Sequence, residues 1–579
     1  MSKILRVNMT TLTTAYEDVP EAYRFLGGRG LTSSIVFDEV EPTCHPLGPN
    51  NKLVFAPGMV TGTAAPTSSR ISVGGKSPLT GTIKESNAGT KFSPMLAKLG
   101  IKAIIVEGQP RDGGWYVLEI DQKGARLVPA GDLVGKGAYA TTDALIGRYG
   151  KVGVCCIGPA GEMKMAMAGV CFNDLSDRAS RYSGRGGLGA VMGSKGLKAI
   201  VVDDKGAPGV EIADKELFDR GRKKLTEALR SHAITKPQGA LNTYGTAVLI
   251  NILNEAGGLP TRNFSSGFFE DAPKISGEAF FEGVKQRLGK ETYNHACSPG
   301  CIIQCSNTWY KPDGTEHVSC QEYESIWAFG ANCGINSLDV TGELIRLCNE
   351  YGLDTIEAGG TIAVAMEGGL AEFGDGQKAI ELLHEIGKGT PLGRILGQGA
   401  AFTGKALGVV RVPGVKGQNM PAYEPRAVKG IGVTYITNPQ GADHTIGYTI
   451  APEILGVSGK ADPLTPEGKA ELSRNFQIAT AFIDSSGYCL FIAFAILDIA
   501  EGFEGMIESC AGVFGTHWTA DDATRIGAEI LKKERAFDQA AGFTSAHDRP
   551  PEFMRYEPLP PHNHVWDVPD EALDKVWDF

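Results

Sequence analysis

Four cysteines are the residues of this chain best suited to bind a metal centre. Cys297, Cys301 and Cys305 lie four residues apart in a segment with a Pro-Gly pair, so we expect a loop there rather than a helix. A remote fourth candidate, Cys489, follows a glycine-containing turn. Three clustered cysteines with one distant cysteine are typical of a [4Fe–4S] cluster. The spacing alone leaves two alternatives open, a zinc site and a set of buried thiols without a chemical role.

Two further side chains could move protons. Glu324 lies where an apolar run follows an acidic pair that it forms with Glu322. A carboxylate that enters a buried site has a raised pKa, which suits proton transfer. Glu322 can also be interpreted as facing solvent. His444 lies in a polar loop, Thr437–Gly447, where a lone histidine is more often structural or exposed than catalytic.

Three glycine-rich or polar turns in the first 200 residues could bind a phosphate group. They are Leu26–Leu31, Thr67–Arg70 with the following Lys76–Gly81 and Ser86–Thr90, and Arg181–Gly189. Exposed backbone N–H groups beside an arginine suit an anion. None of the turns has the Walker or dinucleotide-binding pattern. Each alone is more often a structural turn, but three together favour a large phosphorylated cofactor.

Hydrophobic patterning divides the chain into a β-rich and a helical part. Short β-branched runs between turns predict strands at Lys52–Ala56, Arg70–Val73, Lys102–Glu107, Trp115–Ile120, Val152–Ile157 and Ala199–Asp203. Beyond Asp204, apolar residues at helical spacing predict helices at Asp214–Leu229, Thr341–Glu350, Thr355–Leu370, Lys378–Gly387, Pro466–Ile483 and Asp521–Ala541. No internal repeat is visible in the sequence. We therefore expect an α+β protein whose strands precede its helices.

Length and composition limit the class of protein. A chain of 579 residues exceeds the roughly 250–300 residues at which a single core stops growing, so we expect two or three domains. The net charge of −11 argues against a nucleic-acid partner. Residues 1–8 show no apolar leader, and the twelve cysteines suit a reducing, cytoplasmic compartment. The most apolar stretch, Ser485–Leu497, is shorter than the roughly 20 residues of a membrane span.

Together these motifs resemble the aldehyde:ferredoxin oxidoreductases, tungsten enzymes with a bis-pterin cofactor, over most of the chain. Two similar hexapeptides, Asn349–Asp354 and Asp484–Cys489, are part of the match. The other matching pieces are Gly27–Gly30, Arg70, Lys76–Gly81, Ser86–Gly89, Arg181–Val191, the cysteine triplet, Tyr323–Gly330, Pro421–Gly430 and Ala442–His444. The resemblance implies a β-rich N-terminal domain (1–207) that forms a base for the cofactor. Two mainly helical domains (208–418 and 419–579) would then close over it.

The resemblance also implies the cofactors and the residues that hold them. The expected groups are a tungsten bis-pterin, Mg²⁺ joining the pterin phosphates, and one [4Fe–4S] cluster. Asn87 and the backbone carbonyl of Tyr182 match the magnesium-binding positions. The other matched cofactor contacts are Arg70, Gly89, Arg181, Gly184, Asn349, Asp354, Asp484 and Cys489, with Arg70 between pterin and cluster. Cys297, Cys301, Cys305 and Cys489 match the cluster ligands.

Three departures from the family pattern bear on these expectations. The first gap of the cysteine triplet holds three residues where the family usually has two. Asn349 stands where an aspartate is typical, so its amide could present a donor to a pterin N–H. Tyr488 replaces a usual leucine.

The activity implied is oxidation of an aldehyde with water to a carboxylic acid, with the reverse reduction under strong reductant. Glu324 matches the catalytic glutamate that takes a proton from water, and His444 matches a residue that stabilises negative charge on oxygen. Electrons would leave to ferredoxin, or to a partner subunit carrying several clusters, with or without a flavin subunit that reduces NAD. We expect an oligomer. Two alternatives remain: the tungsten subunit of a benzoyl-CoA reductase, because Cys320 and Cys333 flank Glu324, and a non-catalytic electron-transfer or scaffold subunit that keeps the cluster without the pterin.

Overall fold

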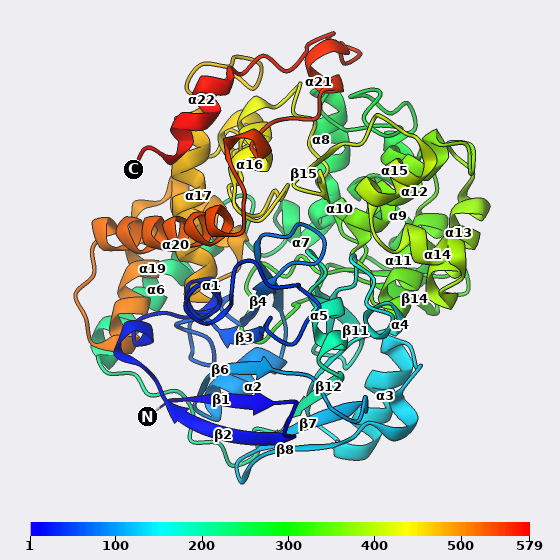
Figure 1. Cartoon of the computed structure of the whole chain (residues 1–579). Helices are drawn as coiled ribbons and strands as arrows, with labels where there is room; N and C mark the ends of the chain where they lie inside the picture. The colour runs from blue at the N-terminus through cyan, green and yellow to red at the C-terminus, as the bar shows by residue number, and fades with distance from the viewer. Residues whose placement is uncertain (1) are drawn as a thin grey trace.

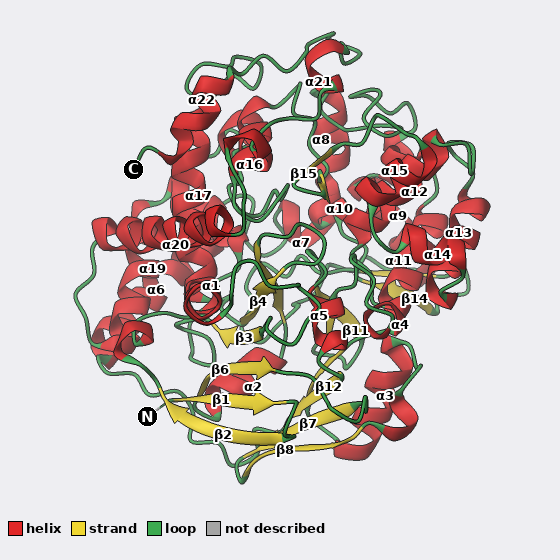
Figure 2. Ribbon diagram, viewed as in Figure 1, coloured by secondary structure: helices red, strands yellow, loops and turns green. Residues whose placement is uncertain are grey.

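The computed structural model describes residues 2–579, and it divides into a β-rich base and a helical cover. Figure 1 shows the blue and cyan N-terminal third, which carries the two six-stranded sheets, below the green to red remainder. Figure 2 shows that the part above is almost entirely helix and loop. This confirms the predicted fold class and the order of its parts.

Two six-stranded sheets make up the base. The first has the order β2-β1-β6-β3-β4-β5. Its strands are β1 (Lys3–Asn8), β2 (Thr13–Asp18), β3 (Leu53–Pro57), β4 (Arg70–Lys76), β5 (Ile83–Gly89) and β6 (Ile101–Glu107). The second has the order β11-β10-β9-β12-β7-β8. Its strands are β7 (Tyr116–Asp121), β8 (Gly124–Pro129), β9 (Gly153–Cys156), β10 (Val170–Asn173), β11 (Ala179–Ser183) and β12 (Leu197–Val202). All six predicted strands are confirmed.

The two sheets share one topology, which the sequence did not reveal. In each, the first strand pairs antiparallel with the second and parallel with the last, and the three remaining strands follow antiparallel. Each also has a 12-residue helix after its second strand, α1 (Gly28–Glu39) and α3 (Ala138–Tyr149). Because β5 and β11 hold equivalent places at the sheet edges and contact each other, the base presents two related halves to the site.

Apolar side chains pack into three layers in the base. One core lies between the sheets and joins their facing side chains to α2 (Phe92–Lys98) and α5 (Leu188–Ser194). A second covers the outer face of the first sheet with α1, and a third covers the outer face of the second sheet with α3. Strands that are buried on both faces need continuous apolar runs rather than alternation, as in the fully buried β3.

The helices of the cover begin and end where local signals predict. Their bounds are α6 (Lys215–Ser231), α7 (Ala240–Tyr244), α8 (Leu249–Glu255), α9 (Gly277–Leu288), α10 (Tyr323–Phe329), α11 (Leu338–Tyr351), α12 (Thr355–Glu367), α13 (Gly376–Lys388), α14 (Pro391–Leu396), α15 (Ala400–Leu407), α16 (Lys429–Thr437), α17 (Lys469–Ser486), α18 (Ala493–Asp498), α19 (Ala500–Phe514), α20 (Ala520–Ala540), α21 (Phe553–Tyr556) and α22 (Asp570–Asp574). Asp214 caps α6 by accepting from the N–H of Leu217, and Thr519 forms a capping box with Asp522 on α20. All six predicted helices are confirmed. Among residues 2–579, no helix combines the length and the hydropathy needed to cross a membrane.

Candidate functional site

A cavity of about 340 Å³ lies where the base meets the helical cover. Most of the residues expected at the site line this cavity. They come from both sheets and from the helical cover. They are Arg70, Asn87, Arg181, Tyr182, Gly184, Cys297, Cys305, Glu324, Asn349, Asp354, His444, Asp484 and Cys489. Gly89 and Cys301 do not line the cavity itself. Gly89 instead packs under Cys297, where a Cβ at position 89 would lie 2.8 Å from the Cys297 sulfur.

Thr67 brings the fourth cysteine to the triplet. Its carbonyl accepts from the N–H of Cys489 at 3.0 Å, and its own N–H donates to the carbonyl of Gly300 at 3.0 Å. Its hydroxyl accepts from the N–H of Ile302 at 3.1 Å. Gly300 has a left-handed φ of +73°, which glycine adopts at little cost. This turn accommodates the extra residue between Cys297 and Cys301, so the unusual spacing is compatible with one site.

Positive charge surrounds the cysteines. The Arg70 guanidinium lies 3.8 Å from the Cys489 sulfur. A hydrogen bond from Cys301 and the charges of Arg181 and Arg70 hold the pKa of the Cys297 thiol well below its ordinary value. The positive charge thus favours the thiolate of Cys297, the form that ligates iron. Burial raises the pKa of the Cys305 and Cys489 thiols.

The two hexapeptides are helix ends that face the same cavity. Gly352 ends α11 and Gly487 ends α17, both in the left-handed region, as is common at helix C-termini. Each glycine packs against the base at equivalent places. Gly158, after β9, would clash with Gly352 if it carried a Cβ, and Gly58, after β3, would clash with Gly487. The related sheets thus dock one hexapeptide each, which two unrelated helix ends would not explain.

Each hexapeptide also presents a carboxylate that is paired with a buried arginine. Arg185 donates to Asp354 at 3.1 Å, and Arg29 lies 3.4 Å from Asp484. Arg29 also makes a two-point contact with Glu534 at 2.9 and 2.8 Å. Burial raises the pKa of Asp484 to about 7 and also raises that of Asp354. The oxygens of these two side chains can accept hydrogen bonds from the N–H groups of a bound heterocycle.

Asn349 retains an acceptor despite replacing an aspartate. Its amide nitrogen donates to the Ser319 carbonyl at 3.1 Å and to the Tyr139 hydroxyl at 3.2 Å. Both amide hydrogens are therefore directed into the protein, and the amide oxygen is left to accept from a ligand. Tyr182 supports this position, because its hydroxyl donates to the backbone carbonyl of Asn349.

Glu324 and His444 meet inside the cavity. Glu324 lies in the first turn of α10 and His444 in the loop before Gly447, and His444 Nε2 is 3.3 Å from Glu324 Oε1. The N–H of Ala422 donates to Glu324 Oε2 at 3.0 Å. Burial raises the pKa of Glu324 to about 8 and lowers that of His444 to about 4. At neutral pH both side chains are therefore uncharged, and Glu324 is poised to exchange a proton.

Unpartnered buried atoms show that the cavity is built for a ligand. Within the described residues, Glu85 Oε1, Glu324 Oε1 and His444 Nδ1 have no hydrogen-bond partner. Buried polar atoms without partners are rare in folded proteins and call for an explanation. Three such atoms on one cavity fit a site that is completed by a cofactor and a substrate. The residues present therefore match the chemistry of the pterin group.

Sequence reasoning missed several residues of the cavity. Glu85 lies beside the matched Ser86–Gly89 and Arg185 within the matched Arg181–Val191, but the sequence assigned a role to neither. Tyr423 and Tyr448 line the wall next to His444. Glu322 also lines the cavity, and its carboxylate accepts a hydrogen bond from the Thr246 hydroxyl at 2.7 Å. The interpretation of Glu322 as solvent-facing was wrong, because the N-terminus of α10 points inward.

The two flanking cysteines differ in position. Cys320 lines the cavity on the side of the cluster cysteines, where its sulfur lies 3.1 Å from Arg181. Cys333 is buried among helices, and its thiol donates to the carbonyls of Ala328 and Gly359. Of the two thiols, only that of Cys320 therefore belongs to a residue that lines the cavity of Glu324 and His444.

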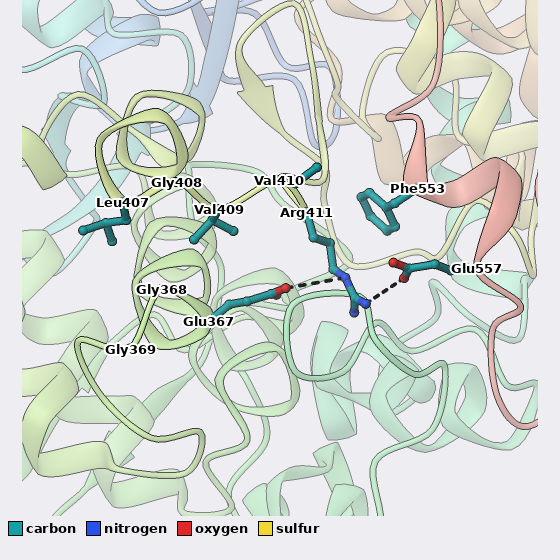
Figure 3. Close-up of a pocket in the computed structure, with 10 residues that line it drawn as sticks. All are labelled: Glu367, Gly368, Gly369, Leu407, Gly408, Val409, Val410, Arg411, Phe553 and Glu557. Carbon is teal, nitrogen blue, oxygen red and sulfur yellow. Dashed lines mark ion pairs between the residues drawn. The ribbon is translucent and has the colours of Figure 1, made fainter.

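A second hollow, of about 550 Å³, lies apart from these residues. Figure 3 shows Arg411 at its centre, between Glu367 and Glu557. The guanidinium lies 3.6 Å from Glu367 and 2.7 Å from Glu557. Its charge is thus neutralised within the protein, and the hollow offers no comparable set of convergent reactive groups.

Comparison of the sequence with known proteins shows the family of the chain. The model of the aldehyde ferredoxin oxidoreductase N-terminal domain matches residues 4–204, and the model of domains 2 and 3 matches residues 221–579. The chain belongs to the aldehyde ferredoxin oxidoreductase family. It is 39% identical to tungsten-containing aldehyde ferredoxin oxidoreductases of Pyrococcus abyssi and Pyrococcus horikoshii, over 96% of this chain and 92% of each relative. This protein is therefore an oxidoreductase of that family.

The fold is also similar to a solved structure of an enzyme complex. It is the active-site complex BamBC of benzoyl coenzyme A reductase in complex with 1,5-dienoyl-CoA. The match has a TM-score of 0.78 and spans 100% of this chain and 93% of the chain in that structure. The sequence identity is 19%, so this likeness concerns the fold alone.

Proposed function

We propose that this protein oxidises aldehydes to carboxylic acids with a tungsten bis-pterin cofactor and a [4Fe–4S] cluster. The observation that carries the proposal is the buried Glu324–His444 pair, which shares one cavity with the cluster cysteines and both hexapeptides. The names of the relatives support the metal and the substrate class. When bound, the tungsten pterin group accepts two electrons from the substrate, and the cluster passes them on singly.

The residues that would hold these groups follow from the cavity. Asp354 and Asp484 would accept from the two pterins, one on each half of the base. Cys297, Cys301, Cys305 and Cys489 would hold the cluster, with Arg70 between cluster and pterin. Asn87 and the Tyr182 carbonyl would contact Mg²⁺ at the pterin phosphates, with Gly89, Arg181 and Gly184 nearby. Asn87 also accepts from Arg70, which fixes the orientation of its amide.

Glu324 would act as the general base. Its ionised form takes a proton from water as the water oxygen attacks the aldehyde carbon. The N–H of Ala422, 3.0 Å from Oε2, orients the carboxylate and leaves Oε1 to face the water. Because burial raises the pKa of Glu324 to about 8, the ionised, active form increases as the pH rises through that value.

His444 would bind the carbonyl oxygen of the substrate. Its Nε2 lies 3.3 Å from Glu324 Oε1, and among the described residues its Nδ1 has no hydrogen-bond partner, so the neutral imidazole would donate from Nδ1 when that atom carries the ring proton. A donor aimed at an oxygen that gains negative charge stabilises the transition state, and more so where water is excluded. The low pKa of His444, about 4, keeps it neutral while it does so.

Electrons would leave through the cysteine loop. Pro299, Gly300 and Gln304 are exposed next to the buried cysteines, so a partner can approach the cluster closely. A ferredoxin is the proposed acceptor, and a permanent subunit with several clusters, with or without a flavin subunit that reduces NAD, is the alternative. We also propose a cytoplasmic, oligomeric enzyme that reduces acids when it is supplied with strong reductant.

Metal analysis combined with a dye-linked assay tests the proposal. We expect about four iron atoms and one tungsten or molybdenum atom per chain, and viologen reduction with acetaldehyde or benzaldehyde. Iron without tungsten or molybdenum would instead indicate a non-catalytic electron-transfer subunit. Turnover of benzoyl-CoA without any aldehyde activity would indicate the benzoyl-CoA reductase alternative.

A further inference from the structure

A third cavity adjoins the candidate active site. It has a volume of about 400 Å³ and lies among α17, α18, α19 and α20. Tyr448, Leu490 and Phe491 line both this cavity and the one that contains Glu324 and His444. The two spaces therefore adjoin each other at these three side chains. We refer to the apolar one as the side cavity.

The side cavity offers hydrocarbon surface and almost nothing polar. No residue that lines it is charged. Its polar lining side chains, apart from Tyr448, are those of the exposed Asn475 and Thr524 and of the buried Thr480. The Tyr448 hydroxyl is already paired with the Tyr423 hydroxyl at 2.9 Å. A polar group placed inside would lose its hydrogen bonds to water without replacement, whereas an alkyl chain would gain by leaving water.

A continuous aromatic wall connects the side cavity to the catalytic pair. The ring of His444 lies 6.3 Å from that of Tyr448, and Tyr448 lies 6.2 Å from Phe494. Phe494 stacks on Phe491 at 5.7 Å. A chain that starts at a carbonyl beside His444 can therefore follow apolar surface from the active site into the side cavity.

We propose that the side cavity binds the alkyl chain of an unbranched aliphatic aldehyde whose carbonyl lies beside Glu324 and His444. This proposal rests on the proposed aldehyde oxidation and specifies its substrate class. It makes medium-chain aldehydes better substrates than acetaldehyde. Each methylene that enters the cavity adds about fourfold in kcat/KM, from about 0.8 kcal/mol for each buried CH₂.

A homologous substrate series tests the preference. With the metal-loaded enzyme and a viologen dye, unbranched aldehydes from two to eight carbons should show kcat/KM rising about fourfold per carbon until the cavity is full. The rise should come from KM, with kcat nearly constant, because the chain contacts are the same in the ground and transition states. A kcat/KM that is flat across the series, in an enzyme that oxidises acetaldehyde, would overturn the proposal.

A cavity-filling variant locates the effect. Ala493 lines the side cavity at the start of α18, so Ala493→Phe should place a ring inside it. We expect this variant to lose about tenfold or more in kcat/KM for octanal, comparable to two lost methylenes, and to keep its activity on acetaldehyde within about twofold. Ala500→Phe, on the exposed start of α19, adds the same ring elsewhere and should match the parent enzyme. Equal octanal activity in both variants would refute the location.

Ligand binding separates this proposal from the proposed reaction. Calorimetry with 1-octanol and 1-butanol needs no turnover and no electron acceptor. 1-Octanol should bind more tightly, with a negative heat-capacity change, and Ala493→Phe should abolish the difference. If no aldehyde is oxidised but 1-octanol still binds in this way, the proposed function fails and the apolar site stands. Equal affinity for both alcohols would refute the site.

Discussion

Replacing Glu324 by glutamine tests two consequences of its burial, its proton transfer in catalysis and its cost in stability. Glutamine keeps the shape and the hydrogen bond from Ala422, which lies 3.0 Å from Glu324 Oε2, but it cannot take a proton. General-base catalysis typically contributes 10²–10⁴-fold, so we expect Glu324→Gln to lower kcat/KM by about that factor. The same change should make the protein more stable at neutral pH, because glutamine carries no charge to desolvate.

The size of the stability gain follows from the pKa. Burial raises the pKa of Glu324 from 4.5 to about 8, so at pH 7 the folded protein keeps a proton that the unfolded chain has released. At about 1.4 kcal/mol per pH unit, this costs roughly 3 kcal/mol of unfolding free energy at pH 7. Below pH 4.5 the carboxyl is protonated in both states, and the cost vanishes. The advantage of Glu324→Gln should thus grow as the pH rises from 4.5 and level off near 8.

Two measurements check this reasoning. Thermal midpoints of parent and variant should be compared at several pH values under anaerobic conditions, because a chain of several domains does not unfold in two states. The parent's kcat/KM should rise with pH and level off near pH 8. Glu372→Gln, on an exposed loop, serves as the control and should change neither quantity. A midpoint difference that is the same at pH 5 and pH 8, or a variant with more than a tenth of parental activity, would refute the assignment.

Three further predictions concern the cluster loop and the buried charges. Cys489→Ala should lose both the iron and the dye-linked turnover, and full iron content with normal activity would show that another residue is the fourth ligand. Gly89→Ala places a methyl group 2.8 Å from the Cys297 sulfur, so iron content measured on the purified protein should fall, whereas an unchanged iron-to-protein ratio would mean that the loop can shift. Arg29→Met leaves two buried carboxylates without their cation, which should cost about 3–5 kcal/mol, seen as a lowered thermal midpoint. Arg24→Met, which removes an exposed arginine, is the control, and equal midpoints for the two variants would contradict the role of the buried charge.

The sequence by itself determined the elements and most of the chemistry of this protein. The strand runs up to Asp203 and the helical periods after Asp214 are local patterns, and each appears as predicted. The cysteine triplet and Glu324 were recognised from residue type and spacing. These features depend on neighbours in the chain, because side-chain periodicity and turn residues act over a few positions.

Only the tertiary structure decided which residues share the site. The matching topology of the two sheets is invisible in the sequence, because pairing order depends on long-range contacts that many sequences can satisfy. Cys489 reaches the triplet through Thr67, more than 400 residues before it in the chain. Arg29 and Arg185 meet their aspartates across gaps of 455 and 169 residues. The burial that lowers the pKa of His444 and the adjoining side cavity both arise from packing of the whole chain, so no local pattern could have predicted them.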